Sequence, residues 1–272
     1  MWRLDLIDGH VHADGLRDAD LDNLARFGVT QALVCSHDGA LDRSHQPTAR
    51  GWLNQFDRLV QAEAARFKTF GIRPLFAIGV HPAYAPWHGL EELLHALPRY
   101  LSLPSVVAIG VLGLREVDVR ERYVLQRQLE LAEQLRRPVI IAAPSRRGDQ
   151  AVRQIIELVR QSGVSPERVL MESVPRQSLP VLRALGFQIA LEISPGRLSA
   201  KQVVGLIQEH GPERWVLTSH AGDGAADLLA VPALAAQLHD AGLSRAVIGR
   251  VGFQNALRFL GRGAPAVRAR VG

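Results

Sequence analysis

The chain has 272 residues, of which 47% are hydrophobic, and it carries a formal net charge of +5 at pH 7 with a pI near 10.1. No apolar run reaches the roughly 18 residues that a membrane span requires, so we expect a soluble protein with no membrane span. The single cysteine, Cys35, excludes an internal disulfide bond, and Asp5 lies where a signal peptide keeps its apolar region; both features predict a cytoplasmic protein.

Strand-like and helix-like segments alternate along the whole chain. Short runs rich in Val, Ile and Leu are typical of buried parallel strands, and they predict strands at residues 4–7, 31–35, 75–80, 106–112, 138–142, 169–171, 188–193 and 215–218. Amphipathic periodicity predicts helices at residues 21–27, 53–67, 90–100, 122–135, 151–161, 178–185, 199–210 and 227–241, followed by a ninth at about 253–260.

Eight β-α units in succession predict an α/β fold, a (β/α)8 TIM barrel, formed by residues 1–272 as a single domain. The alternative is an open, doubly wound sheet, but no Gly-x-Gly-x-x-Gly turn follows the first strand. A barrel carries its active site at the C-terminal ends of its strands. The residues that follow each predicted strand are therefore the candidate site residues.

The first strand ends in Asp8-Gly9-His10-Val11-His12. Side chains of a β-strand alternate between its two faces, so His10 and His12 are expected to point the same way. Two adjacent imidazoles at a strand end form half of a metal site. Asp8 is a candidate for orienting a ligating imidazole or for a local capping role.

Further polar residues follow the later predicted strands: Cys35 and His37, His81 and Trp87, Arg146, Glu172, Glu192, and finally His220 and Asp223. Cys35 and His37 raise the hypothesis of a thiolate nucleophile. The alternative is that Cys35 simply packs at the end of a buried strand, and this reading is favoured.

The chain resembles the TatD-related metal-dependent hydrolases of the amidohydrolase superfamily over nearly its whole length. Asp8-x-His10-x-His12 matches the family's first motif, and Gly79-x-His81-Pro82 matches a second. The run Phe253-Gln254-Asn255 is similar to the family's C-terminal Asn-Pro motif, with Ala256 in place of proline. The resemblance implies a TIM barrel, hydrolase chemistry with bound metal, and a substrate pocket shaped partly by His81.

Four of the family's metal-binding positions differ here. The resemblance places the bridging glutamate at Val111, the fifth-strand histidine at Ala142, the sixth-strand histidine at Ser173 and the eighth-strand aspartate at His220. Without these ligands a centre of two metal ions is not expected, because two nearby cations need bridging anions to offset their repulsion.

We therefore predict a single divalent ion, zinc in the first instance, held by His10, His12 and His220. Glu192, Glu172 or Asp223 would accept a proton from water. His81, Trp87 and Arg146 are the predicted substrate-binding residues, Arg146 as a phosphate contact. The expected reaction is hydrolysis of a phosphoester or amide bond in a small molecule or nucleotide.

Two other functions stay open. The losses at Val111, Ala142 and Ser173 are compatible with a non-catalytic barrel that binds a metabolite or a protein partner. The basic pI suggests a nucleic-acid partner, but the arginines are scattered along predicted helices opposite acidic residues, as on a solvated face. Nucleic acid is therefore a less favoured partner than a small molecule.

Overall fold

The computed structural model describes residues 4–37, 47–144, 148–193, 197–224 and 226–262. Eight parallel strands follow one another around a single sheet in chain order. Their bounds are β1 Leu6–Val11, β2 Val29–Cys35, β3 Arg73–Ala77, β4 Val106–Gly113, β5 Val139–Ala142, β6 Val169–Glu172, β7 Gln188–Glu192 and β8 Trp215–Thr218. A parallel bridge between Val11 and Ala221 joins the last strand to the first. The sheet is thus a nearly closed barrel, and the predicted (β/α)8 fold is confirmed.

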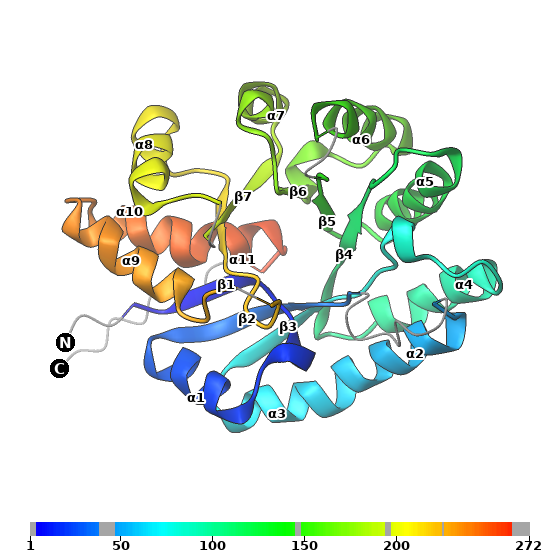
Figure 1. Cartoon of the computed structure of the whole chain (residues 1–272), viewed down its shortest axis with the longest axis horizontal. Coiled ribbons are helices and arrows are strands. Elements are labelled where there is room, and N and C mark those ends of the chain that lie inside the picture. Colours follow the sequence, from blue (N-terminus) through cyan, green and yellow to red (C-terminus); the bar gives the residue numbers. More distant parts are fainter. Residues whose placement is uncertain (1–3, 38–46, 145–147, 194–196, 225, 263–272) are drawn as a thin grey trace.

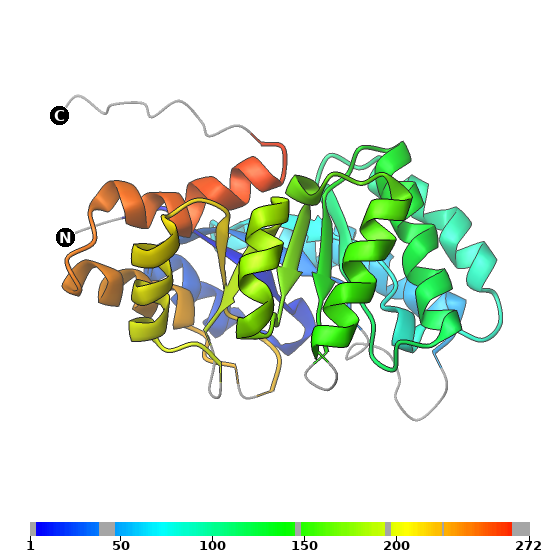
Figure 2. The ribbon, with the colours of Figure 1, turned by 90° about the horizontal axis from the view of Figure 1, so that it is seen from above.

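The helices lie outside the strands around most of the barrel (Figure 1). Their bounds are α1 Asp18–Arg26, α2 Ala49–Arg58, α3 Ala64–Thr69, α4 Leu90–Leu101, α5 Val119–Gln134, α6 Gly148–Ser162, α7 Leu179–Leu185, α8 Ala200–His210, α9 Ala230–Asp240, α10 Arg245–Gly249 and α11 Asn255–Phe259. Figure 2 shows α6, α7 and α8 side by side along one flank of the barrel. In the described part of the chain, no helix is both long enough and apolar enough to cross a membrane.

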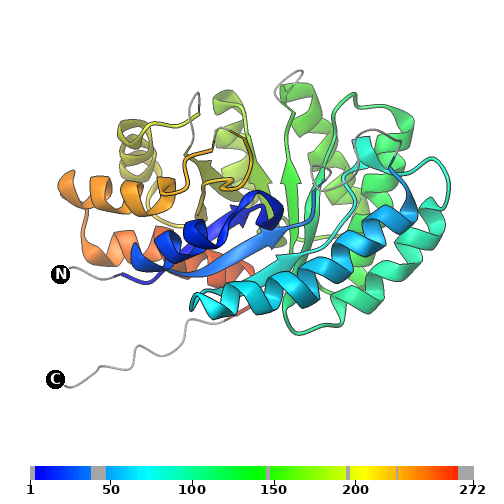
Figure 3. The ribbon, with the colours of Figure 1, turned by 60° about the horizontal axis from the view of Figure 1, so that its bottom comes forward.

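The helix predicted at residues 53–67 is one long element that runs through α2 and α3 (Figure 3). A π-helical turn, Leu59–Glu63, joins the two helices. Three residues after Glu63, Arg66 binds the Glu63 carboxylate at 2.7 Å and donates to the carbonyl oxygens of Ala13 and Leu16. This helix therefore anchors the loop that follows β1.

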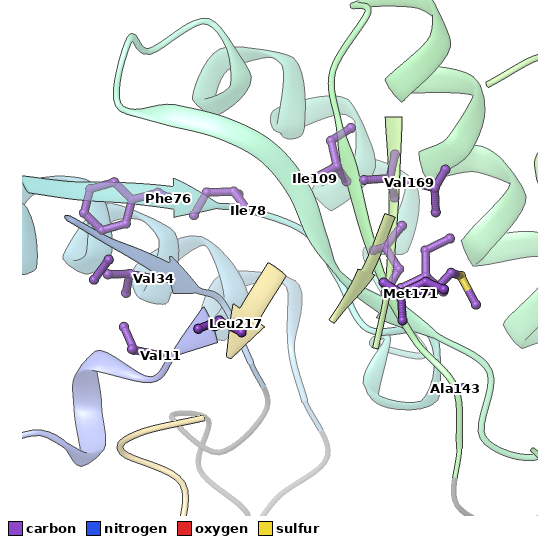
Figure 4. Packing of buried hydrophobic residues seen from close by; sticks show 14 of the residues in the cluster. Val11, Val34, Phe76, Ile78, Ile109, Ala143, Val169, Met171 and Leu217 are labelled. Carbon is purple, nitrogen blue, oxygen red and sulfur yellow. The ribbon is translucent and has the colours of Figure 1, made fainter. Parts of the chain in front are cut away.

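Buried apolar side chains form two clusters. The larger includes Val34, Phe76 and Leu217 on the strands (Figure 4) together with the buried faces of the helices. The smaller gathers side chains from all eight strands, such as Leu33, and adds residues of α11, such as Phe259. Alternation along each strand separates the two clusters, as expected for a barrel with helices outside and a packed interior.

Strand β1 is longer than predicted, because it continues through Asp8 and His10 to Val11. Its pairing register with β2 shifts between Asp8 and Val11. Gly9 allows the close approach of β8, since a Cβ there would lie 2.6 Å from Val216 Cγ1. The prediction of residues 4–7 was wrong because the strand continues through polar residues, whose hydrogen bonds are made only in the assembled barrel.

Candidate metal centre

The ends of β1 and β8 are joined backbone to backbone. The amide of His220 donates to the carbonyl oxygen of His10 at 3.0 Å, and the amide of His12 donates to that of Ala221 at 2.8 Å. These bonds bring three imidazole rings together, with centroids 4.6 Å apart for His10 and His12, 3.9 Å for His10 and His220, and 6.0 Å for His12 and His220. The three histidines therefore lie close together, as the sequence predicted.

Each of these rings has a buried nitrogen without a hydrogen-bond partner among the described residues: His10 Nε2, His12 Nδ1 and His220 Nε2. The rings offer three ligand atoms that lie within 4.8 Å of one another. A buried polar atom without a partner is costly, and a metal ion would satisfy all three at once. The residues present therefore fit one metal ion.

Burial lowers the pKa of His10 to about 3 and that of His220 to about 4, and it lowers the pKa of His12 well below its usual value. Neighbouring imidazoles act in the same direction, because a second positive charge nearby is unfavourable. All three rings are therefore neutral at pH 7. The neutral imidazole is the form that binds a metal ion.

Glu172, at the end of β6, faces His10 across the barrel interior. Its carboxylate oxygens lie 2.9 and 3.0 Å from His10 Nδ1. Burial raises the pKa of Glu172 to about 7. The electrostatic effect of His220 partly offsets this rise, and that of Glu192 reinforces it. Because this carboxylate is engaged with His10, its predicted role as a proton acceptor for water is not supported by the contacts.

Asp8 makes its contacts with the backbone and with Ser219 rather than with an imidazole ring. Its carboxylate accepts hydrogen bonds from Ser219 Oγ at 2.5 Å, from the Ser219 amide at 3.1 Å and from the His10 amide at 3.2 Å. Burial raises the pKa of Asp8 to about 6 against these bonds. Asp8 thus ties β1 to the segment that carries His220.

Left-handed backbone occurs at two site positions, His220 with φ +56° and Ser173 with φ +52°. Residues other than glycine seldom adopt this conformation, and it tends to occur at functional sites. Gly222 also has positive φ, at +91°, and a Cβ there would overlap the carbonyl oxygen of His12. The loop after β8 is therefore shaped to lie directly against the loop after β1.

His37 also lies close to the histidine triplet, although the sequence indicated a role for it only as a partner of Cys35. Its ring centroid lies 4.0 Å from that of His12, and its Nε2 lies 2.7 Å from Asp14 Oδ1. Cys35 is buried, its Sγ lies 3.8 Å from the Leu33 carbonyl oxygen, and burial raises the pKa of its thiol well above the usual value. A thiolate nucleophile at Cys35 is therefore excluded, since a buried thiol stays protonated.

The other two predicted proton acceptors, Glu192 and Asp223, differ in their surroundings. Glu192, at the end of β7, is buried and accepts a hydrogen bond from Ser173 Oγ at 3.0 Å. Its other carboxylate oxygen forms an ion pair with Arg197 Nε at 3.2 Å. Asp223 is exposed on the loop after β8, where its amide donates to the His220 carbonyl oxygen at 2.9 Å. Both carboxylates act electrostatically on His10 and His220.

Two of the predicted substrate-binding residues, His81 and Trp87, lie in the segment that follows β3. His81 Nδ1 accepts from the Ala83 amide at 3.2 Å, and its Nε2 faces Gly113 at the end of β4. Trp87 is 67% exposed, and the Arg120 guanidinium lies 4.3 Å from its ring centroid, so Trp87 lies on the surface. Arg146 falls outside the described residues.

At three positions where the family resemblance places metal ligands, this chain has residues that are apolar or hydrogen-bonded to another side chain: Val111, Ala142 and Ser173. Val111 is only 8% exposed and belongs to the barrel-interior cluster, against which Ala142 packs. Ser173 donates to Glu192. Within the described residues, His10, His12 and His220 are the one group of three or more metal-ligand side chains close enough to share an ion.

Known proteins resemble this chain in sequence. A family model described as TatD related DNase matches residues 7–208. An uncharacterised metal-dependent hydrolase from Methanocaldococcus jannaschii is 26% identical over 255 residues, which cover 93% of this chain and 99% of the relative.

Among solved structures, the TatD-like protein from Archaeoglobus fulgidus has a TM-score of 0.75 at 24% identity, over 94% of this chain and 99% of that one. A phosphotriesterase homology protein from Escherichia coli, solved with phosphate in its active site, has a TM-score of 0.68 at 15% identity, over 96% of this chain and 100% of that one. At these identities the structural likeness shows the fold alone.

Proposed function

The chain belongs to the family of TatD-related DNases, with a metal-dependent hydrolase among its relatives, and we propose that it is a hydrolase that works with one divalent ion. The observation that carries this proposal is the set of three neutral imidazoles at the mouth, of which those of His10 and His12 are buried and that of His220 is half-buried. Each has a buried nitrogen without a hydrogen-bond partner among the described residues. Their donor set suits zinc first and also copper, nickel or iron. Such an ion supplies Lewis acidity, which makes a water molecule easier to deprotonate and a substrate carbonyl or phosphoryl group easier to attack.

One ion is proposed rather than two. Two unit charges 4 Å apart repel by about 4 kcal/mol at an effective dielectric constant of about 20, and two dications multiply this several-fold. A bridging carboxylate would offset that repulsion, but the bridging position holds Val111, and Ala142 and Ser173 add no nitrogen ligands. The described mouth residues therefore favour a mononuclear site.

We propose Glu192 and Asp223 as the groups that accept the proton from water. Glu192 has the better-defined position, because Ser173 and Arg197 hold its two oxygens. Glu172 is not included, because it lies against His10 Nδ1, whereas the nitrogen of His10 that is open to an ion is Nε2.

His81 is proposed as a hydrogen-bond donor to the substrate. Its Nδ1 accepts from the backbone, so the proton of the neutral ring resides on Nε2. Burial and the charge of Arg115 lower its pKa to about 4, which keeps the ring neutral at pH 7. Trp87 and Arg146 remain proposed substrate contacts, and the proposed substrate is a phosphoester or amide in a small molecule or nucleotide.

A second candidate is a barrel that binds a metabolite or a protein partner without catalysis. The observation in its favour is that Val111 is part of the apolar interior and no longer a polar mouth residue. We propose the cytoplasm as the compartment for either function, supported by the single, buried Cys35.

The first test is the metal content of the chain purified without a polyhistidine tag and without chelator. We expect about one zinc ion per chain, and its loss in His220→Ala, because two imidazoles hold zinc much more weakly than three. His95→Ala is the matched control, since His95 is exposed on α4. Wild-type protein that folds normally yet binds no divalent metal would contradict the proposal and favour the non-catalytic barrel.

Activity is tested on a phosphodiester and an anilide model substrate with zinc, cobalt or nickel added back after chelation. We expect hydrolysis of one of the two classes, abolished in His10→Ala/His12→Ala. Hydrolysis that survives in this double variant would show that the reaction does not depend on metal.

A further inference from the structure

Among the described residues, Glu172 is the carboxylate that is hydrogen-bonded to the imidazole of a candidate metal ligand, His10. It ends β6 with no exposed surface, and both of its oxygens lie within 3.0 Å of His10 Nδ1. The other buried carboxylates of the mouth are engaged elsewhere: Asp8 binds Ser219 and the backbone, and Glu192 binds Ser173 and Arg197. Neither of them contacts an imidazole of the histidine triplet within hydrogen-bond distance.

This contact determines which nitrogen of His10 faces the centre. When Glu172 is ionised, as at the pH of about 8 used below, its carboxylate can only accept hydrogen bonds, so His10 Nδ1 carries the ring proton. The lone pair then lies on Nε2, which is buried and has no hydrogen-bond partner among the described residues. Without such a partner, a neutral imidazole exchanges between two tautomers, and only one of them presents Nε2 as a ligand.

We propose that Glu172 is a positioning residue that fixes His10 in the Nδ1–H tautomer and holds its ring with Nε2 toward the ion. This inference rests on the proposed function for its metal and deepens it by assigning the residue that orients a ligand. A carboxylate behind a ligating imidazole also increases the basicity of the ligand. Glu172 does not touch substrate or ion, and it acts through His10.

Placement in the fold supports this role. Glu172 is paired in register with Ala142 on β5, which has no polar side chain that could compete for the carboxylate. His10 and Glu172 are 162 positions apart and come from nearly opposite parts of the barrel. A buried carboxylate is costly unless it has a specific partner, and His10 is the hydrogen-bond partner that the structure gives it.

The tautomer is measured directly by nitrogen NMR of the histidine rings at about pH 8, in metal-free protein. We expect the Nδ1–H form for His10 in the wild type and in Glu172→Asp, which keeps the charge. In Glu172→Gln the side chain can both donate and accept, so a mixture or the Nε2–H form is expected. Glu121→Gln is the matched control: Glu121 is a buried carboxylate that accepts hydrogen bonds from the backbone amides of residues 115–117, so the change should leave the His10 tautomer unchanged.

Zinc affinity, measured by competition with a chelator, gives the second readout. Glu172→Gln should weaken binding by about 10- to 100-fold, the usual cost of losing such a partner. Glu172→Asp should recover most of this loss, and the control Glu121→Gln should stay within about 3-fold of the wild type.

The outcomes separate this inference from the proposed function. Wild-type protein without zinc affinity would overturn the mononuclear hydrolase, whereas the NMR experiment would still decide the role of Glu172. An Nε2–H tautomer in the wild type, or wild-type affinity in Glu172→Gln, would overturn the positioning role alone. Circular dichroism checks the fold of each variant, and if Glu172→Gln does not fold, an Nε2–H tautomer in Glu172→Asp overturns the proposal.

Discussion

At the scale of single residues, the mouth is divided into a polar and an apolar part. His10, His12 and His220 lie at the ends of β1 and β8, whereas Val111 on β4 belongs to the buried interior and Ala142 packs against it. The division matters for metal binding because an ion needs several donors converging on one point. A single polar substitution in the apolar part would add one donor without the others.

Val111→Glu tests this division. We expect the variant to bind no more zinc than the wild type, about one ion per chain, because Ala142 and Ser173 still provide no nitrogen ligands. Its free energy of unfolding should fall by about 2–4 kcal/mol, since an unpaired carboxylate enters an apolar environment. Elemental analysis and urea unfolding measure the two effects, and Val111→Leu is the control for a change of shape. Two ions per chain in Val111→Glu would show that the second site had lost only its bridge.

At the scale of elements, the closure of the barrel depends on the junction of β1 with β8. The bridge between Val11 and Ala221 and two backbone hydrogen bonds, from His220 to His10 and from His12 to Ala221, link β1 to the segment that follows β8. Asp8 adds three hydrogen bonds, two of them with Ser219. Since this junction sets the distance between His10 and His220, it positions the candidate site as well as closing the fold.

Ser219→Ala should therefore destabilise the protein by about 2–3 kcal/mol at pH 7, because the buried carboxylate of Asp8 loses its hydroxyl donor. Thr218→Val is the matched control in the neighbouring position. Thr218 is fully buried, and its hydroxyl has no hydrogen-bond partner among the described residues, so this change should be neutral or slightly stabilising. Equal effects of the two substitutions on urea unfolding would contradict the proposed importance of the Asp8–Ser219 pair.

At the scale of the whole molecule, the buried titratable groups predict how stability depends on pH. The pKa of His10 is about 3, those of His81 and His220 are about 4, and that of His12 is also lowered, all through burial. Near pH 5 to 6 the unfolded chain therefore binds up to four protons that the folded protein does not. Asp8 and Glu172 act in the opposite direction, because burial raises their pKa values to about 6 and about 7.

Four histidines against two carboxyl groups leave a difference of about two protons. With chelator present, the free energy of unfolding should rise by about 2–3 kcal/mol per pH unit between pH 5 and 6, and level off above about pH 7. Urea unfolding at several pH values measures this slope. His81→Asn should reduce the slope by about one proton, or about 1.4 kcal/mol per pH unit. Stability that is unchanged or greater at pH 5 than at pH 7 would contradict the assignment of neutral, buried histidines.

The sequence by itself determined the eightfold alternation of strands and helices and the position of β8, and it singled out His10, His12 and His220. Each of these follows from local information. Apolar periodicity reports which face of a segment is buried, and side-chain alternation places residues two apart on one face of a strand.

The tertiary structure alone decided that β1 continues through Asp8 and His10, that Glu172 binds His10, and that Cys35 is sealed in the interior. His10 and Glu172 are 162 positions apart, and Asp8 and Ser219 are 211 apart. Hydrogen bonds over such separations exist only once the barrel has closed, and no periodicity within a segment records them. Closure also satisfies the polar groups of β1, which is why a strand can pass through residues that its own composition would assign to a loop.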